Sequence, residues 1–216
     1  MSTDREYNTF MPTPSADQII RAEIELQRLD PLLGPLIQAQ APINRLRGGD
    51  YFAALTRSII GQQVSVAAAA AIYGRFEAAT NLNPQKVTTL TIEDLRALGL
   101  SRGKAGYIQD LAQHFVKDAA VFDHLDALTD DEVIAELIKV KGIGVWTAQM
   151  FLMFTLGRLD VFAPDDGGLQ RAVAKLYGLE KVPPKAELIK IAEKWAPYRT
   201  IASWHLWESL NNLPVK

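Results

Sequence analysis

The sequence predicts an all-α protein, and three observations favour this class. Polar helix-start residues followed three positions later by Glu, Gln or Asp recur along the chain. Apolar residues between glycine- and proline-containing breaks follow helical spacing, and no segment shows the sustained alternation typical of a strand. Apolar residues make up 48% of the 216 positions, enough for one ordinary domain or two small lobes.

Start and stop signals divide the chain into the expected helices. Ser15 and Gln18 form the pattern of a capping box, which opens an amphipathic helix that ends near Leu29. Residues 31–48 contain several prolines and glycines and are expected to form a loop or short broken helices. Further helices are expected over residues 51–78 with an interruption near Gly61, 91–99, 102–118, 129–140, 145–156, after Asp166, 184–195 and 198–211.

Composition excludes several classes of protein. The chain has no cysteine, which rules out disulfides, thiolate metal sites and a cysteine-held iron–sulfur cluster. Residues 1–14 are polar, lack the apolar stretch of a signal peptide and are expected to be disordered. No apolar run approaches the roughly 18 residues that span a membrane, so we expect a soluble, intracellular protein. The net charge of −2 counts against nucleic-acid binding unless positive charge is gathered locally.

The segment Leu137–Ala148 carries the strongest motif. A capped helix ends, a Gly-x-Gly turn at Gly142 and Gly144 follows, and another helix begins. Gly142 can adopt a positive φ, and Gly144 lets a ligand approach the amides of the next helix. Those amides, the helix dipole and the neighbouring Lys139 and Lys141 suit a DNA phosphate. The alternative is an ordinary corner between two helices.

The residues around this turn resemble the helix-hairpin-helix, Gly/Pro-rich, Asp-containing DNA glycosylase superfamily. The hairpin 140–148, the link 157–164 and the pair Asp165-Asp166 match its pattern, and the resemblance covers roughly residues 15–211. It implies two helical lobes flanking an active-site cleft within a single unit, 15–216. The central lobe would span about 60–165 with the hairpin 137–148, and the second lobe would combine the N-terminal helix with about 166–212.

The branch of the superfamily is narrowed by three features. Trp146 stands where bifunctional members carry a catalytic lysine, and the four-cysteine cluster of other branches is absent. The segments 60–67, 160–166 and 195–207 resemble the DNA-3-methyladenine glycosylase II branch in a compact form without an N-terminal β-rich domain. The resemblance implies a monofunctional base excision repair enzyme. It would hydrolyse the N-glycosidic bond of alkylated cationic purines such as 3-methyladenine and 7-methylguanine and leave an abasic site, without lyase activity.

Other functions stay open at this point. The chain could be a non-catalytic helix-hairpin-helix protein that holds the DNA backbone, or a glycosylase for deaminated or mismatched bases. An all-α scaffold unrelated to DNA is favoured only by the acidic balance of charge.

The resemblance assigns a carboxylate and a base pocket. Asp166 is the predicted catalytic residue, which would stabilise an oxocarbenium-like state, whereas Asp165 is expected to be the helix N-cap. The alternative is that both acids only cap a helix. The predicted pocket comprises Trp146, Trp207 and Met150, and the two tryptophans offer aromatic faces that attract a cationic base. Trp204 is expected to belong to the core.

The resemblance also assigns residues that flip the base and hold the backbone. The wedge that fills the gap left by a flipped base is predicted in the 61–65 loop, chiefly Gln63 with Gln62 and Ser65. An N-cap or a buried amide is the alternative. Some relatives have an apolar wedge at Gln63 and an aromatic residue at Gly167, and these departures could narrow the substrate range. The predicted phosphate contacts are Gly142, Gly144, Val145, Lys139, Lys141, Arg102 and Lys104.

The remaining expectations concern partners. No cofactor is required, although the backbone of Val140 and Ile143 could hold a structural Na⁺ or K⁺. The expected partner is double-stranded DNA with alkylated bases, bound by a monomer. The location would be intracellular and with DNA, in a bacterial nucleoid or a eukaryotic nucleus.

Overall fold

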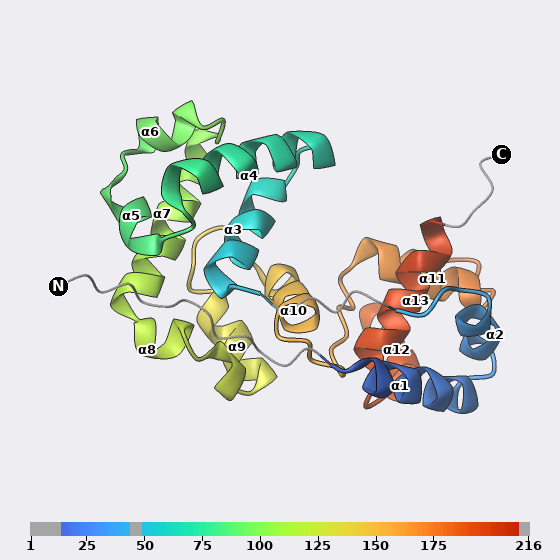
Figure 1. Ribbon diagram of the computed structural model, residues 1–216. Coiled ribbons are helices and arrows are strands. Elements are labelled where there is room, and N and C mark those ends of the chain that lie inside the picture. Colours follow the sequence, from blue (N-terminus) through green and yellow to red (C-terminus); the bar gives the residue numbers. More distant parts are fainter. Residues whose placement is uncertain (1–13, 44–48, 212–216) are drawn as a thin grey trace. The chain divides into compact units, whose positions relative to one another are not determined.

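The computed structural model describes residues 14–43 and 49–211. All regular structure in these ranges is helical, which confirms the all-α prediction (Figure 1). The expectation for residues 1–14 lies, apart from Pro14, outside the described residues, as does part of the 31–48 segment. None of the helices in these two ranges combines the length and the apolar character that a membrane crossing demands.

The chain divides into two compact units. In the described ranges, the first comprises residues 49–151, and the second comprises residues 14–43 together with 152–211. Both limits of the first unit precede those of the central lobe expected at about 60–165. The helix that begins at Tyr51 packs on the helix of residues 102–117 and so joins the first unit. Phe154 packs on aromatic residues near the C-terminus and so joins the second.

The first unit is built around one long helix. Four of its apolar residues recur at helical spacing and are buried, as the sequence indicates: Ile108, Leu111, Ala112 and Phe115. That helix, α7, contacts α3, α5, α6 and α8. The elements of the unit are α3 (Tyr51–Gly61), α4 (Val66–Thr80), α5 (Pro84–Thr89), α6 (Ile92–Ala97), α7 (Arg102–Lys117), α8 (Ala119–Phe122), the 3-10 turn η1 (Leu125–Ala127), α9 (Asp130–Leu137) and the first part of α10 (Val145–Phe154).

The long helix expected over 51–78 is two helices. α3 ends at Gly61, and α4 begins after Ser65, whose hydroxyl accepts the Ala68 amide as an N-cap. Between them Gln63 has a φ of 55°, which no continuous right-handed helix allows. The predicted interruption near Gly61 is therefore confirmed.

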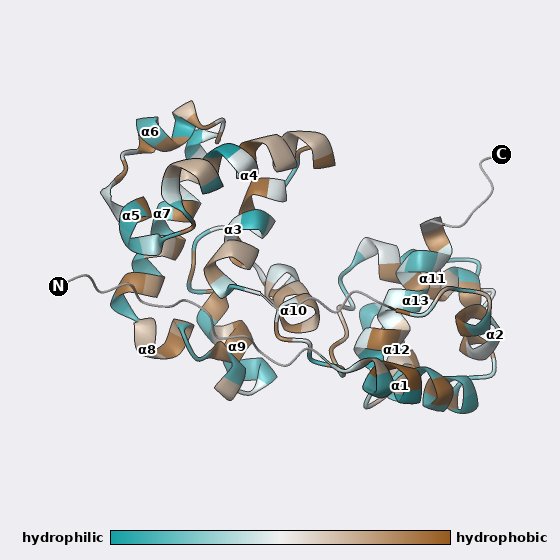
Figure 2. Cartoon of the chain, in the orientation of Figure 1, coloured by the Kyte–Doolittle hydropathy of each residue, from teal (hydrophilic) through white to brown (hydrophobic). Residues whose placement is uncertain are grey.

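The second unit is built around α13, which packs on α11, α1 and α2, while α1 also packs on α2. Both hydrogen bonds of the predicted capping box between Ser15 and Gln18 are present. Polar and apolar residues alternate around α1 (Figure 2), and Ala22 and Leu26 are fully buried. The elements are α1 (Ala16–Leu29), α2 (Leu33–Gln38), α11 (Gly167–Leu176), α12 (Lys185–Glu193) and α13 (Arg199–Asn211).

A buried carboxylate ties the second unit together. Asp30 is 1% exposed and accepts hydrogen bonds from Trp195 Nε1 at 2.8 Å, from the Tyr177 hydroxyl and from the Leu32 amide at 3.0 Å. Lys194 Nζ lies 3.4 Å from the same carboxylate. Burial pushes the pKa of Asp30 upward, but these hydrogen bonds outweigh burial, so the pKa lies below its ordinary 3.8.

We expect Asp30→Asn to lower the free energy of unfolding at pH 7 by about 2 kcal/mol, because hydrogen bonds to a buried charge are lost. Since the folded-state pKa is depressed, this stabilisation is present above pH 3.8 and is lost as the pH falls through the folded value. Urea titrations at several pH values measure it. The exposed Glu180→Gln serves as control, with a change within about 0.5 kcal/mol. An Asp30→Asn protein as stable as the parent at pH 7 would contradict the assignment.

Candidate functional site

The hairpin turn is fixed by a close approach of backbone to an aromatic ring. Gly142 has a φ of +83°, and a Cβ on it would lie 2.3 Å from Cδ2 of Tyr107 on α7. The Ile143 amide donates to the Val140 carbonyl at 3.1 Å, and Ile143 is buried. α9 ends at Leu137, three residues before the expected end near Val140, because the chain enters this turn. Only glycine fits at position 142.

The other glycine of the hairpin faces open space. A Cβ on Gly144 would meet no atom within 4 Å, and Val145 is 46% exposed. The first backbone hydrogen bond of α10 runs from the Ala148 amide to the Gly144 carbonyl at 3.0 Å. Amides that precede it have no acceptor within the helix and point out of its N-terminus. The turn therefore presents an accessible helix start suited to an anion.

Three of the four predicted phosphate-binding cations pair with carboxylates. The pairs are Lys139 with Glu136 at 2.6 Å, Lys141 with Asp110 at 3.1 Å and Arg102 with Glu93 at 2.8 Å. The three cations are exposed, and ion pairs at a protein surface contribute only about 0–1 kcal/mol, so a phosphate can replace the carboxylate at little cost. The fourth cation, Lys104, differs: its ammonium donates to the Ile60 and Gln62 carbonyls at 2.8 and 2.5 Å.

Asp110 holds the hairpin and was not singled out from the sequence. Its carboxylate accepts the Lys141 amide at 2.8 Å in addition to the Lys141 side chain. Burial raises the pKa of Asp110, but both bonds from Lys141 outweigh burial and lower it overall. The signal in the sequence is its position on α7, three residues after Tyr107 and six after Lys104.

The predicted wedge loop is attached to the hairpin by Gln62. Its side-chain Nε2 donates to the Gly142 carbonyl at 2.9 Å, so Gln62 is half-buried and faces the protein. Gln63 is exposed and holds the left-handed backbone. Ser65 is an N-cap, which is the alternative weighed for this loop. Val64 is a large apolar side chain beside Gln63 with 39% exposure, a feature that the sequence alone did not single out.

The N-cap of α11 is Asp166, so the expectation that Asp165 fills this position is wrong. Asp166 Oδ1 accepts the Leu169 amide at 2.7 Å and the Trp207 Nε1–H at 2.9 Å. Asp165 instead pairs with Lys185 at 2.6 Å. The helix begins at Gly167, directly after Asp166 as expected, so the residue next to its first turn is Asp166 and not Asp165. Two donors on one oxygen fix the Asp166 carboxylate against the Trp207 indole.

A glycine makes room for this pair. A Cβ on Gly168 would lie 2.9 Å from Asp166 Oδ1 and 3.1 Å from Trp207 Cδ1. A pair of glycines directly after the acidic residues was the available signal, although it drew attention only to Gly167. The structure thus shows that a side chain at Gly168 would crowd both the carboxylate and the indole.

The remaining predicted pocket residues lie on α10. Trp146 is 45% exposed and Met150 is half-buried, both in the first unit, whereas Asp166 and Trp207 belong to the second. Within the second unit, Phe154 packs against Trp207 and edge-on against Trp204, at ring-centre distances of 5.9 and 5.8 Å. The structure therefore brings Asp166 and Trp207 together and places Trp204 in the aromatic packing beside them.

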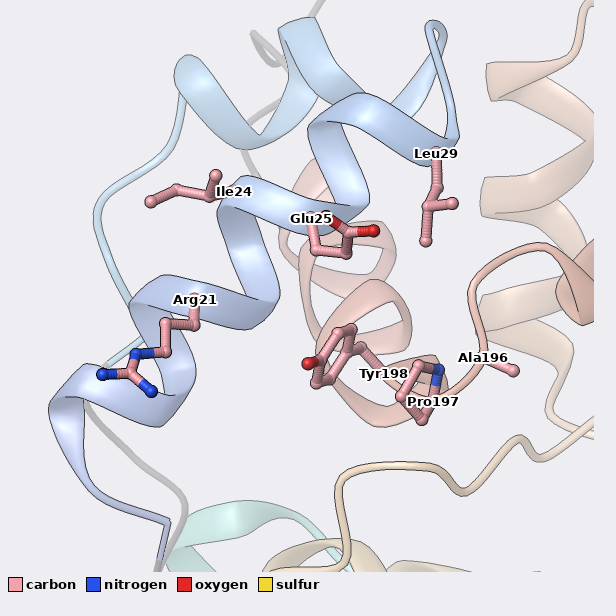
Figure 3. Close-up of a pocket in the computed structure, with 7 residues that line it drawn as sticks. All are labelled: Arg21, Ile24, Glu25, Leu29, Ala196, Pro197 and Tyr198. Atoms are coloured by element: carbon pink, nitrogen blue, oxygen red, sulfur yellow. The ribbon is translucent and has the colours of Figure 1, made fainter.

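A groove elsewhere in the second unit contains none of the predicted site residues. It lies between α1 and the turn before α13 (Figure 3). Its lining residues are Arg21, Ile24, Glu25, Leu29, Ala196, Pro197 and Tyr198.

The hairpin between α9 and α10, followed by an aspartate at a helix start, defines a helix-hairpin-helix protein of the DNA-binding kind. The model of the HhH-GPD superfamily of base excision DNA repair proteins matches residues 56–197, so the chain belongs to this superfamily. The DNA-3-methyladenine glycosylase 1 of Schizosaccharomyces pombe is 31% identical over 199 residues, covering 88% of this chain and 87% of that protein.

Solved structures agree with this placement. A DNA-3-methyladenine glycosidase from Bacillus halodurans is 36% identical with a TM-score of 0.80, covering 88% of this chain and 89% of that one. The S. pombe 3-methyladenine DNA glycosylase in complex with abasic DNA is 30% identical with a TM-score of 0.77, covering 91% and 100%. These relatives confirm the predicted superfamily and the resemblance to its DNA-3-methyladenine glycosylase branch.

The two hairpin glycines should separate stability from binding. We expect Gly142→Ala to lower the free energy of unfolding by about 2–4 kcal/mol, because the new Cβ meets Tyr107 and the positive φ is strained. Gly144→Ala meets nothing, so its stability should change by less than about 1 kcal/mol while its affinity for duplex DNA falls about tenfold. Urea denaturation and fluorescence anisotropy measure the two effects. Equal losses of stability would refute this division of roles.

Proposed function

We propose that this protein is a monofunctional DNA glycosylase that removes alkylated, positively charged purines from duplex DNA and leaves an abasic site. The observation that supports it most is the Asp166 carboxylate held by the Trp207 indole at the start of α11, in a chain of this superfamily. The names of its relatives, which are 3-methyladenine glycosylases, favour alkylated purines as the substrate class.

The carboxylate supplies the chemistry of the bond-breaking step. Cleavage of an N-glycosidic bond leaves positive charge on the sugar, and a carboxylate beside it stabilises that charge. The Leu169 amide and the Trp207 indole both donate to Oδ1 of Asp166, so the group is oriented before the substrate arrives. A preoriented charge needs no rearrangement in the transition state, which makes this contribution large.

The leaving group explains why one acid is enough. A cationic alkylpurine departs as a neutral base, so it needs no proton from a second carboxyl group. Aromatic faces attract such a base by about 0.5–2 kcal/mol each. Trp207, Trp146 and Met150 are the proposed pocket residues. Trp146 also occupies the position where a lyase carries its amine, which favours hydrolysis without strand cleavage.

The first unit supplies the grip on DNA. The helix start after Gly144, with Val145, would bind a phosphate through backbone amides, while Lys139 and Lys141 would exchange their carboxylate partners for phosphate. Gln63 is the proposed wedge that fills the space of the flipped base, with Val64 as a neighbouring apolar alternative.

A monovalent cation at the hairpin remains part of the proposal. The Val140 carbonyl accepts the Ile143 amide, and a carbonyl oxygen has a second lone pair that can face Na⁺ or K⁺. Such an ion would add positive charge beside the phosphate. Membership of a DNA repair superfamily places the chain with DNA. We propose that it acts there as a monomer, inside the cell and without a required cofactor.

Incubation with DNA treated with a methylating agent tests the activity. We expect free 3-methyladenine and 7-methylguanine by chromatography, with strands that break only after added alkali. Asp166→Asn should reduce the release rate by about 10²–10³, because a fixed charge at the reacting sugar is lost. Its affinity for duplex DNA should stay within threefold of the parent.

Three results would contradict the proposal. Full excision by the Asp166→Asn protein would remove Asp166 from the chemistry. Release of uracil or hypoxanthine from defined duplexes, without release of methylpurines, would replace the substrate class by deaminated bases. Binding without any release would favour a non-catalytic backbone-binding protein.

Gly168→Ala probes the orientation of the carboxylate. The added Cβ crowds Asp166 Oδ1 and the Trp207 ring, so we expect the rate of release to fall about tenfold or more. Gly167→Ala is the matched control, since beyond its two neighbours in the chain its Cβ would approach only the flexible end of Arg171, at 3.4 Å. Single-turnover rates on one methylated duplex compare them. A larger loss for Gly167→Ala than for Gly168→Ala would show that crowding of the carboxylate is not the cause.

A further inference from the structure

One face of α7 carries three side chains that reach the proposed DNA-contacting segments. Lys104, Tyr107 and Asp110 follow one another at intervals of three, which places them on one side of a helix. Tyr107 packs against the backbone of Gly142, and Asp110 accepts the amide of Lys141. The hairpin is therefore held by the middle of α7.

Lys104, the first of these residues, contacts the wedge loop and not the hairpin. Lys104 Nζ donates to the Ile60 carbonyl at 2.8 Å and to the Gln62 carbonyl at 2.5 Å. Both carbonyls lie at the C-terminus of α3, where the last carbonyls have no donor within the helix and carry the negative end of its dipole. An ammonium group satisfies both requirements.

The Gln62 carbonyl belongs to the same peptide group as the Gln63 amide. A planar peptide group that is held at its oxygen also fixes the direction in which the next residue leaves. Gln63 leaves with a φ of 55°, a conformation that costs an ordinary residue roughly 1–2 kcal/mol. Lys104 therefore holds the peptide group between Gln62 and Gln63, which precedes the strained φ of Gln63. Gln62 Nε2 attaches the same segment to the Gly142 carbonyl.

The surroundings of Lys104 differ from those of the other predicted phosphate contacts. Lys104 is half-buried, and burial lowers the pKa of its ammonium. Arg102, Lys139 and Lys141 are exposed and have carboxylate partners. A cation turned toward the protein and shared between two carbonyls is poorly placed for exchange with a phosphate.

We infer that Lys104 is a positioning residue that fixes the wedge loop, and not a contact to the DNA backbone. This inference rests on the proposed function, in which residue 63 fills the space of a flipped base. It proposes a different role for Lys104 from the expected phosphate contact, and it links the loop to the hairpin through α7. When Lys104 holds the loop, binding of the hairpin to the DNA backbone places Gln63 at a defined position on the DNA.

The first test needs no DNA. Lys104→Met removes the donors and keeps most of the side-chain length, and Lys117→Met removes an exposed lysine from the last turn of the same helix. NMR relaxation should show the amide order parameters of Gln63 and Val64 falling from about 0.85 to below 0.6 in Lys104→Met only. Lys104→Arg keeps donors and should retain most of the order. Should the Met variant fail to fold, Lys104→Gln, with two donors on a shorter stem, should show a smaller drop.

The second test uses duplex DNA with 2-aminopurine beside the methylated base. We expect Lys104→Met to lower the fluorescence rise of base flipping and the single-turnover rate about tenfold, with KM within twofold of the parent. The slope of log affinity against log salt should be unchanged, whereas loss of a phosphate contact would reduce it by about 0.9. Lys117→Met should match the parent in flipping and rate.

The outcomes separate the two proposals. A reduced salt slope with unchanged order parameters would overturn the positioning role and make Lys104 a phosphate contact. Unchanged order parameters alone would also overturn it. A parent protein that releases no methylpurine would refute the proposed function, yet the order parameters measured without DNA would still decide whether Lys104 holds the loop.

Discussion

The contact between the Gly142 backbone and the Tyr107 ring is the constraint on which the first unit depends. It leaves no space for a side chain and sets the turn from which α10 begins. Because the Gly142 carbonyl also accepts Gln62 Nε2, the same residue fixes the start of the wedge loop. The start of one helix and a loop from a distant part of the sequence are thereby held by one packed turn.

In the second unit, the main feature is the Asp166 carboxylate, a charged group that is held in one orientation by hydrogen-bond donors. Asp166 ends the extended link and begins α11, so its carboxylate performs the ordinary work of an N-cap. The Trp207 indole adds a second donor to the same oxygen. Asp166 can therefore cap the helix and also perform the proposed catalysis. The sequence analysis treated these two roles as alternatives, but one does not exclude the other.

Local signals made much of this fold predictable. Capping boxes at Ser15 and Thr129 and the break near Gly61 are properties of neighbouring residues, and the structure contains all three. α5 and α8, with six and four residues, are too short to show a helical period, and they lack the capping box that marks the equally short α6. The shift of the N-cap by one residue lies within the usual uncertainty of helix boundaries.

The candidate site was predictable only in part. The hairpin and Asp166 were found because their residues are close in sequence and resemble a known pattern. The carbonyl contacts of Lys104 depend on how α7 packs against the end of α3, more than forty residues earlier, and no local pattern reports such packing. The proposed roles of Trp146 and Met150 remain predictions, since they concern a substrate.

The carboxylate partners of Arg102, Lys139 and Lys141 also affect how the protein would travel along DNA. A surface whose cations are already neutralised exerts little long-range attraction, in keeping with a net charge of −2. Each undamaged site would be held weakly and left quickly, because a phosphate that replaces a carboxylate on the same cation adds little net attraction. Such a protein would spend less time at each site and inspect more base pairs in a given time, which suits a search for rare lesions.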